Sequence, residues 1–297
     1  VASLAAAALW TQWRQVEIEI AERGRAQNQW LMAGALDWTR LILAEDARSA
    51  QSIDHLGEPW ALPLQEARLS SFLSAQPGFN SDASDALAAQ VFLSGRIIDL
   101  QSRLNVANLL NNDQLSAADM AAFAKLWDVL GLPPTQLLSL AEGLRQSRAP
   151  AKDALPSAPL PPQRLRQLAW LGVPAATLTK LQEHVVWLPE RTTVNINTAS
   201  AEVLYASLPT LDYADAQRMV RARANRPWAS LEEARQALGS QSHNLLENRH
   251  SVSSRFFEIT GQIRLDSSLL VEKTTIQREG VDVRLLWRER GALGSLQ

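Results

Sequence analysis

The fold of this chain is decided by its first 48 residues, VASLAAAALWTQWRQVEIEIAERGRAQNQWLMAGALDWTRLILAEDAR (residues 1–48). Nine of the first ten residues are apolar, and the helical pattern meets no stop before Gly57 and Pro59. At about 1.5 Å per residue, one helix over this stretch is roughly 70 Å long. A single small domain cannot cover such a helix, so we expect it to project from the body or to pack against other chains.

Apolar residues follow a helical spacing in both halves of this stretch. Trp13, Val16 and Ile20 form an upper stripe, and a lower stripe repeats the spacing at Leu31, Ala35, Trp38 and Ile42. No sheet expected from the sequence is long enough to cover the upper stripe. We therefore predict that partner helices pack on five upper residues, namely Leu9, Trp10, Trp13, Val16 and Ile20. Two alternatives stay open, an ordinary helix buried in a globular core and self-dimerisation.

The apolar start, residues 1–10, is too short to cross a bilayer, which needs about 20 apolar residues. The chain begins without Met, and Trp10 and Trp13 lie where an interfacial aromatic belt is expected. We expect a longer hydrophobic segment to precede this one in the gene product.

Strands are predicted by residues that alternate between apolar and polar. Residues 91–100 alternate with a bulge or bend at Gly95, and residues 255–265, 269–278 and 281–287 alternate again around a Glu279–Gly280 hairpin turn. The apolar face of this antiparallel sheet needs a cover, and the long helix is the available one. The predicted fold class is α+β, with the N-terminal helix packed on a C-terminal antiparallel sheet and a large all-helical insertion over residues 111–250.

The sequence of the insertion predicts short helices joined by turns. Asp113 or Ser116 is expected to cap the first, followed by helices over 135–146, 162–171 and 175–188. Residues 193–238 predict three more, the first capped by Asn197 or Thr198 and the last by Ser230. Residues 70–90 are expected to form a loop or a short helix.

Composition argues against several classes of function. A formal charge of −2 gives no overall attraction to nucleic acid, and the absence of cysteine excludes disulfides and thiolate chemistry. The four histidines are scattered, and His243 and His250 flank a loop where solvated histidines are common. The run 54–60 (DHLGEPW) places His55 beside two carboxylates, but Gly57 and Pro59 favour a turn over a metal site. We predict no catalytic residues, no metal ligands and no cofactor.

Four stretches carry a resemblance to a known family: 54–60 (DHLGEPW), 95–110 (GRIIDLQSRLNVANLL), 193–204 (TVNINTASAEVL) and 223–231 (RARANRPWASL). With the lead helix and the terminal sheet, they resemble the type II secretion minor pseudopilins of the protein K family, which have a pilin-like fold. The residues that match the family's motifs, taken as structural, are Asp54, Gly57, Trp60, Asp99, Asn105, Asn108, Asn195, Asn197, Ala199, Arg223 and Trp228.

The resemblance implies a non-enzymatic subunit at the tip of a periplasmic pseudopilus, anchored in the inner membrane by its N-terminal helix before assembly. It implies the minor pseudopilins I and J as partners, then H and the major pseudopilin, and no nucleic acid. From the helix and strand patterns, we expect pilin-like residues 1–110 and 251–297 and helical subdomains 111–192 and 193–250. Some family members bind calcium through an acidic loop, but the matching residues 148–162 hold only Asp153. No calcium is expected there.

The main alternative is nucleic-acid binding, because residues 193–238 also resemble a helix-hairpin-helix. Such hairpins carry glycines that let backbone N–H groups approach a phosphate. Here the hairpin is Leu208-Pro209-Thr210-Leu211-Asp212, without glycine. The five arginines of the segment are balanced in number by five carboxylates. A phosphate-binding surface needs an excess of basic groups.

Overall fold

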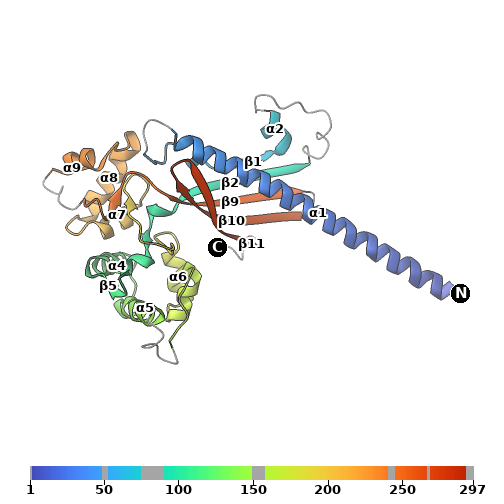
Figure 1. Cartoon of the computed structure of the whole chain (residues 1–297), viewed down its shortest axis with the longest axis horizontal. Coiled ribbons are helices and arrows are strands. Elements are labelled where there is room, and N and C mark those ends of the chain that lie inside the picture. Colours follow the sequence, from blue (N-terminus) through green and yellow to red (C-terminus); the bar gives the residue numbers. More distant parts are fainter. Residues whose placement is uncertain are drawn as a thin grey trace. The chain divides into compact units, whose positions relative to one another are not determined.

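The computed structural model describes residues 2–48, 53–74, 90–148, 158–239, 245–265 and 268–291. The chain divides into two compact units (Figure 1). The sheet unit comprises Val1–Ser49, Pro59–Ile98 and Phe257–Gln297, and the helical unit comprises Ala50–Glu58 and Asp99–Phe256.

The long helix and the sheet are both present as predicted. Helix α1 runs without a break over Ala2–Asp46, because no proline interrupts its apolar spacing. The five-stranded sheet has the order β1-β2-β9-β10-β11. Its strands are β1 (Leu64–Arg68), β2 (Val91–Asp99), β9 (Phe256–Leu265), β10 (Ser268–Glu279) and β11 (Asp282–Gly291). Figure 1 shows α1 crossing one face of the sheet, with its N-terminal half extending past the strands.

The most deeply buried face of α1 lies next to the lower apolar stripe noted in the sequence. The buried residues are Asn28, Met32, Leu36, Thr39 and Leu43, whereas the predicted lower stripe of Leu31, Ala35, Trp38 and Ile42 is only half-buried. One residue corresponds to a rotation of about 100° around the helix. Two neighbouring faces of α1 are apolar, so the spacing alone could not decide which of them meets the sheet.

The deepest part of this core lies under the last turns of α1. Leu43 and Phe257 are fully buried, and the ring of Trp60, in the short 3-10 helix η1 (Pro59–Ala61), meets Phe257 edge-on at 5.2 Å. The guanidinium of Arg278 lies 4.8 Å from the Phe257 ring centroid and pairs with Asp46 at 2.8 Å. Trp60, selected as a motif residue, is therefore a core residue of the sheet unit.

Glycines fix two details of the sheet. The β10–β11 hairpin turns through Gly280 with φ 59°, as the Glu279–Gly280 pair predicted. At Gly95 an added Cβ would lie 2.9 Å from the carbonyl oxygen of Thr260, so a larger residue would push β2 away from β9. Strand β1 was not predicted, and only α2 (Leu69–Ser74) is described of the expected loop or short helix at 70–90.

The helical unit contains the predicted helices and several short strands that were not predicted. Its longer elements are α4 (Ala117–Val129), α5 (Pro134–Ser147), the 3-10 helix η4 (Leu165–Leu171), α6 (Ala175–Leu181), α7 (Ala201–Ser207), α8 (Tyr213–Asn225) and α9 (Leu231–Leu238). Two further 3-10 helices are η2 (Leu100–Ser102) and η3 (Val106–Leu109). Strand β3 (Leu104–Asn105) pairs with β6 (Val185–Val186), β4 (Leu110–Asn111) with β5 (Gln114–Leu115), and β7 (Val194–Asn195) with β8 (His250–Ser251). Helix α6 ends at Leu181, not at 188, because the following residues pair with β3.

One continuous core fills this unit. It joins Phe123 and Trp127 of α4 and Leu140 of α5 to Leu204 of α7 and Met219 of α8. The division into subdomains 111–192 and 193–250 therefore does not correspond to separate cores. The unit also begins at Asp99 rather than at residue 111, because residues 99–110 pack and hydrogen-bond within it.

Candidate functional site

The upper half of α1 is exposed along its whole length. The five residues predicted to pack on partner helices, Leu9, Trp10, Trp13, Val16 and Ile20, each leave 48–68% of their surface in solvent. The rings of Trp10 and Trp13 lie 5.5 Å apart, so they form one aromatic patch. Ile18 adds a further exposed apolar side chain on another face. In the described part of the chain, no element covers this half of the helix. None of the described helices is apolar enough over a sufficient length to cross a membrane.

The first group of motif residues forms a buried polar cluster in the helical unit. The amide nitrogen of Asn195 donates to the Asp54 carbonyl oxygen (3.0 Å), to Asp99 Oδ2 (3.1 Å) and to Ser254 Oγ (3.0 Å). The Asp54 carboxylate accepts from the Ser254 backbone N–H at 2.7 Å. Three segments that are distant in sequence are thus joined through one amide, which gives these residues a structural role.

Asp99 is one of the two buried acids of this cluster. Burial raises the pKa of its carboxyl group, and hydrogen bonds from Thr198 (2.5 Å), Ser254 (2.7 Å) and the Gln101 backbone (2.7 Å) oppose that rise. Its neighbours supply hydroxyl, amide and backbone groups that hold this one carboxyl group in place.

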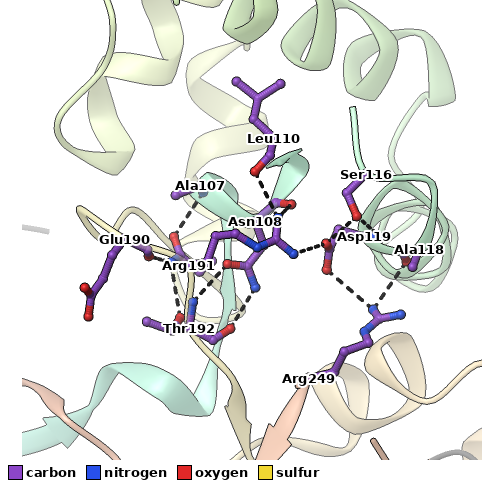
Figure 2. A network of polar contacts seen from close by, with 11 residues as sticks. Ala107, Asn108, Leu110, Ser116, Ala118, Asp119, Glu190, Arg191, Thr192 and Arg249 are labelled. Carbon is purple, nitrogen blue, oxygen red and sulfur yellow. Dashed lines mark hydrogen bonds and ion pairs between the residues drawn. The ribbon is translucent and has the colours of Figure 1, made fainter. Parts of the chain in front are cut away.

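Asn105 and Asn108 connect residues 105–108 to the loop at 188–192. Figure 2 shows Asn108 beside Thr192. Asn105 donates to the Glu190 carbonyl oxygen at 2.7 Å and accepts from the backbone N–H groups of Ala107 and Leu188. Asn108 bonds both backbone groups of Thr192, at 2.8 and 3.0 Å. A side-chain amide can imitate a backbone pairing in this way, so each asparagine acts as a bridge between two chain segments.

Beside this bridge lies an ion network that sequence reasoning missed (Figure 2). Asp119, at the start of α4, accepts from Arg191 (2.8 Å) and Ser116 Oγ (2.6 Å), and Arg249 lies 3.6 Å away. Arg191 also donates to the carbonyl oxygens of Asn108 and Leu110. The only sequence signal was the Ser116 cap, which the structure confirms.

The second group of motif residues joins the start of α7 to α8 and the turn after it. Asn197 exchanges two hydrogen bonds with the backbone of Trp228, both at 3.0 Å, and Arg223 donates to the carbonyl oxygens of Ile196 and Ala199. Asn197 is therefore not the cap of α7, and neither is Thr198. Ser200 performs that role through the Val203 backbone N–H.

The three histidines in the described part of the chain do not form a catalytic or ligand set. His55 closes its own turn: its ring nitrogen accepts from the Gly57 N–H at 3.1 Å, and its backbone N–H donates to Glu58. His250 was expected in solvent but is 1% exposed, because it belongs to β8, which pairs with β7. Burial and the neighbouring Arg249 lower the pKa of His250 to about 4. His243 lies outside the described residues.

The hairpin between α7 and α8 is closed to a phosphate. Lys125 of α4 donates to the carbonyl oxygens of Leu208 (2.9 Å), Pro209 (3.3 Å) and Leu211 (3.3 Å), and burial lowers the pKa of this lysine. A phosphate would need backbone N–H groups at this place. The arginines also disfavour phosphate binding. Arg218, Arg226 and Arg235 each pair with a carboxylate, and Arg223 is buried.

Comparison with known proteins shows similarity to a component of the type II secretion system. Residues 194–253 match the family model described as type II secretion system protein K, and five of the motif residues lie in that range. The chain is 26% identical over 280 residues to the type II secretion system protein K of Pseudomonas aeruginosa, covering 85% of this chain and 77% of the relative.

A solved structure shares the fold. It is the crystal structure of the GspK-GspI-GspJ complex from the type 2 secretion system of enterotoxigenic Escherichia coli, with a TM-score of 0.67 and 19% identity. The similarity covers 91% of this chain and 98% of the other. The pilin-like α+β fold with a helical insertion is thereby confirmed. In sequence the chain is thus similar to type II secretion system protein K, and in fold it is similar to a chain of the GspK-GspI-GspJ complex.

Proposed function

We propose that this chain is a minor pseudopilin at the tip of a type II secretion pseudopilus, where it nucleates assembly with the minor pseudopilins I and J for protein export across the outer membrane. The observation that carries the proposal is the exposed apolar stripe on the upper half of α1, from Leu9 to Ile20. The GspK neighbour was crystallised with two further chains, GspI and GspJ, which supports I and J as partners.

Burial of the stripe supplies a driving force of suitable size. Burying one large apolar side chain contributes about 1.5–3 kcal/mol relative to leaving it exposed. Each of the five stripe residues is about half-covered or less in the isolated chain. Their joint burial would thus contribute several kcal/mol toward the cost of association.

The helical unit supports a terminal position in the filament. It is a large insertion with one continuous core, and its loops are held by the amides of Asn105, Asn108, Asn195 and Asn197. A folded insertion of this size would obstruct lateral stacking of subunits, whereas a subunit at the end of the filament avoids that obstruction.

Several finer features belong to the same proposal. We place the protein in the periplasm, anchored in the inner membrane by its N-terminal helix before assembly, with H and the major pseudopilin as further neighbours. It acts by packing and not by catalysis. Segment 148–162 holds no calcium, because Asp153 alone supplies too few carboxylate ligands.

The proposal is tested by making the stripe charged. The double variant Trp13→Glu/Val16→Glu should fold as the parent does, because both side chains are exposed, but it should lose co-purification with co-expressed I and J. Trp170→Glu, a change at a half-exposed tryptophan of the helical unit, is the matched control and should retain both partners. Undiminished recovery of I and J with the double variant would refute the proposal.

A further inference from the structure

The ion network at the start of α4 has one positive charge in excess. The carboxylate of Asp119 is shared by Arg191, at 2.8 Å, and Arg249, at 3.6 Å. Figure 2 shows both guanidinium groups turned toward this carboxylate. Among the described residues, neither arginine pairs with a second acid. Two cations are therefore balanced by one anion.

Arg249 is the less well satisfied of the two arginines. Its side chain is only 14% exposed, and its Nη2 atom donates to the Ala118 carbonyl oxygen at 3.3 Å and lies 3.6 Å from Asp119. Charge-assisted hydrogen bonds are normally shorter, about 2.7–2.9 Å. Its Nε and Nη1 groups have no acceptor in the part of the chain that the structure describes. A largely buried charge with unused donors is costly, so a further acceptor would stabilise it.

Arg191, in contrast, is well satisfied by the protein. Its Nη1 atom donates to the carbonyl oxygens of Asn108 at 2.6 Å and Leu110 at 2.9 Å, and its Nη2 atom donates to Asp119 at 2.8 Å. The excess charge is thus located at Arg249.

A polar cavity of about 100 Å³ lies beside these groups. A water molecule needs at least about 10–15 Å³, so the cavity has room for a group of several atoms. The Thr192 hydroxyl accepts from the Asn105 amide and keeps its own O–H for another acceptor. The Asn248 amide makes no hydrogen bond to the described residues, and Asn248 is exposed, so the cavity can be reached from solvent. The polar residues that line the cavity include Asn108, Asp119, Arg191, Thr192, Asn248 and Arg249.

We propose that this cavity binds a carboxylate, with Arg249 as the charged donor and Thr192 and Asn248 as neutral donors. A carboxylate carries the one negative charge that the network lacks, and its two oxygens match the fork of a guanidinium. A phosphate dianion would add a negative charge that the arginines do not balance, close to Asp119. The carboxylate belongs either to a small free molecule or to a peptide. The inference goes beyond the proposed function, and its failure would leave the packing of α1 untouched.

The first test measures the melting temperature of the full chain in sodium acetate, with sodium chloride holding the ionic strength constant. Near-saturating acetate should raise the melting temperature of the parent by at least about 3 °C, because a ligand that binds only the folded state stabilises it. Arg249→Gln should abolish this rise. Arg218→Gln, at an exposed arginine outside the cavity, is the matched control and should keep it. An equal rise in the parent and in Arg249→Gln would overturn the inference.

Asp119→Asn separates a ligand site from a purely structural ion pair. This change removes the carboxylate that competes with the ligand, so calorimetry should show acetate binding at least tenfold more tightly, even though the variant itself is less stable. Lower stability without tighter binding would contradict the inference. Should Arg249→Gln fail to fold, Asn248→Ala replaces it, since Asn248 is exposed and its loss should weaken acetate binding severalfold.

A pair of peptide probes distinguishes the source of the carboxylate. N-acetyl-alanyl-alanine presents a free carboxyl group, and its C-terminal amide does not. Binding of the acid but not of the amide identifies a peptide as the ligand, whereas binding of acetate alone identifies a small free molecule. Binding of neither acetate nor the peptide acid would overturn the inference.

Discussion

Replacing His250 by Asn should remove a defined part of the acid sensitivity of the helical unit. The imidazole is 1% exposed, and its Nδ1 accepts a hydrogen bond from the Leu246 backbone N–H at 3.1 Å. Burial is the main reason that its pKa falls to about 4, and Arg249 and Arg235 add to the effect. Asparagine places an oxygen close to the position of Nδ1 and carries no titratable group, so His250→Asn is the suitable change.

The direction in which pH changes the free energy of unfolding follows from proton binding. In the unfolded chain this histidine protonates near pH 6.5, but in the folded chain only near pH 4. Between these values the unfolded state binds more protons, so the free energy of unfolding decreases as the pH falls from 6.5 to 4. A difference of about 2.5 pKa units at 1.36 kcal/mol per unit amounts to about 3 kcal/mol.

The assay is urea unfolding followed by circular dichroism at several pH values from 7.5 to 4, for the parent and for His250→Asn. The difference between the two curves cancels the contribution of all titrating groups that the two proteins share. The parent should lose about 3 kcal/mol more than the variant over this range. Parallel curves for the two proteins would refute the buried, neutral state of His250.

Three further predictions concern stability and calcium. Leu43→Ala should lower the free energy of unfolding by about 2–5 kcal/mol in urea titrations, because it opens a cavity under α1 beside Trp60 and Phe257; a loss below 1 kcal/mol would contradict the core register. Asn195→Ala should cost roughly 1–3 kcal/mol, because Asp99 and its neighbours lose a buried donor; Asn28→Ala, outside this cluster, is the comparison. Asp153→Asn should leave calcium binding, measured by calorimetry, as it is in the parent.

The sequence predicted the elements with strong periodicity and missed those set by tertiary pairing. α1 and the β10–β11 hairpin follow from apolar spacing and from Gly280, both of which are local signals. The rotation of α1 could not be predicted, because Met32 and Leu31 are equally apolar and only the sheet decides between them. The short strands β3 and β6 have two residues each, too few for any alternation to appear.

The candidate functional residues also divide into those with a local sequence signal and those set by long-range contacts. The stripe from Leu9 to Ile20 was visible because its residues repeat along one helix. The bonds of Lys125 to the α7–α8 hairpin join residues more than 80 positions apart, so nothing near Lys125 in the sequence indicates them. Asn197 was read as a cap because asparagine is common at helix starts, but a donor and an acceptor on the Trp228 backbone bind it instead.

The chain contains no cysteine, so a single introduced thiol reports on one position alone. Maleimide labelling of Val16→Cys, with Trp170→Cys as the reference, measures directly whether partner subunits cover the upper half of α1. Both thiols should react rapidly in the isolated chain, since both positions are exposed. In the complex with I and J, the thiol at position 16 should react at least tenfold more slowly, while the thiol at 170 is unchanged. Equal reactivity of the Val16→Cys thiol with and without I and J would contradict packing through this helix.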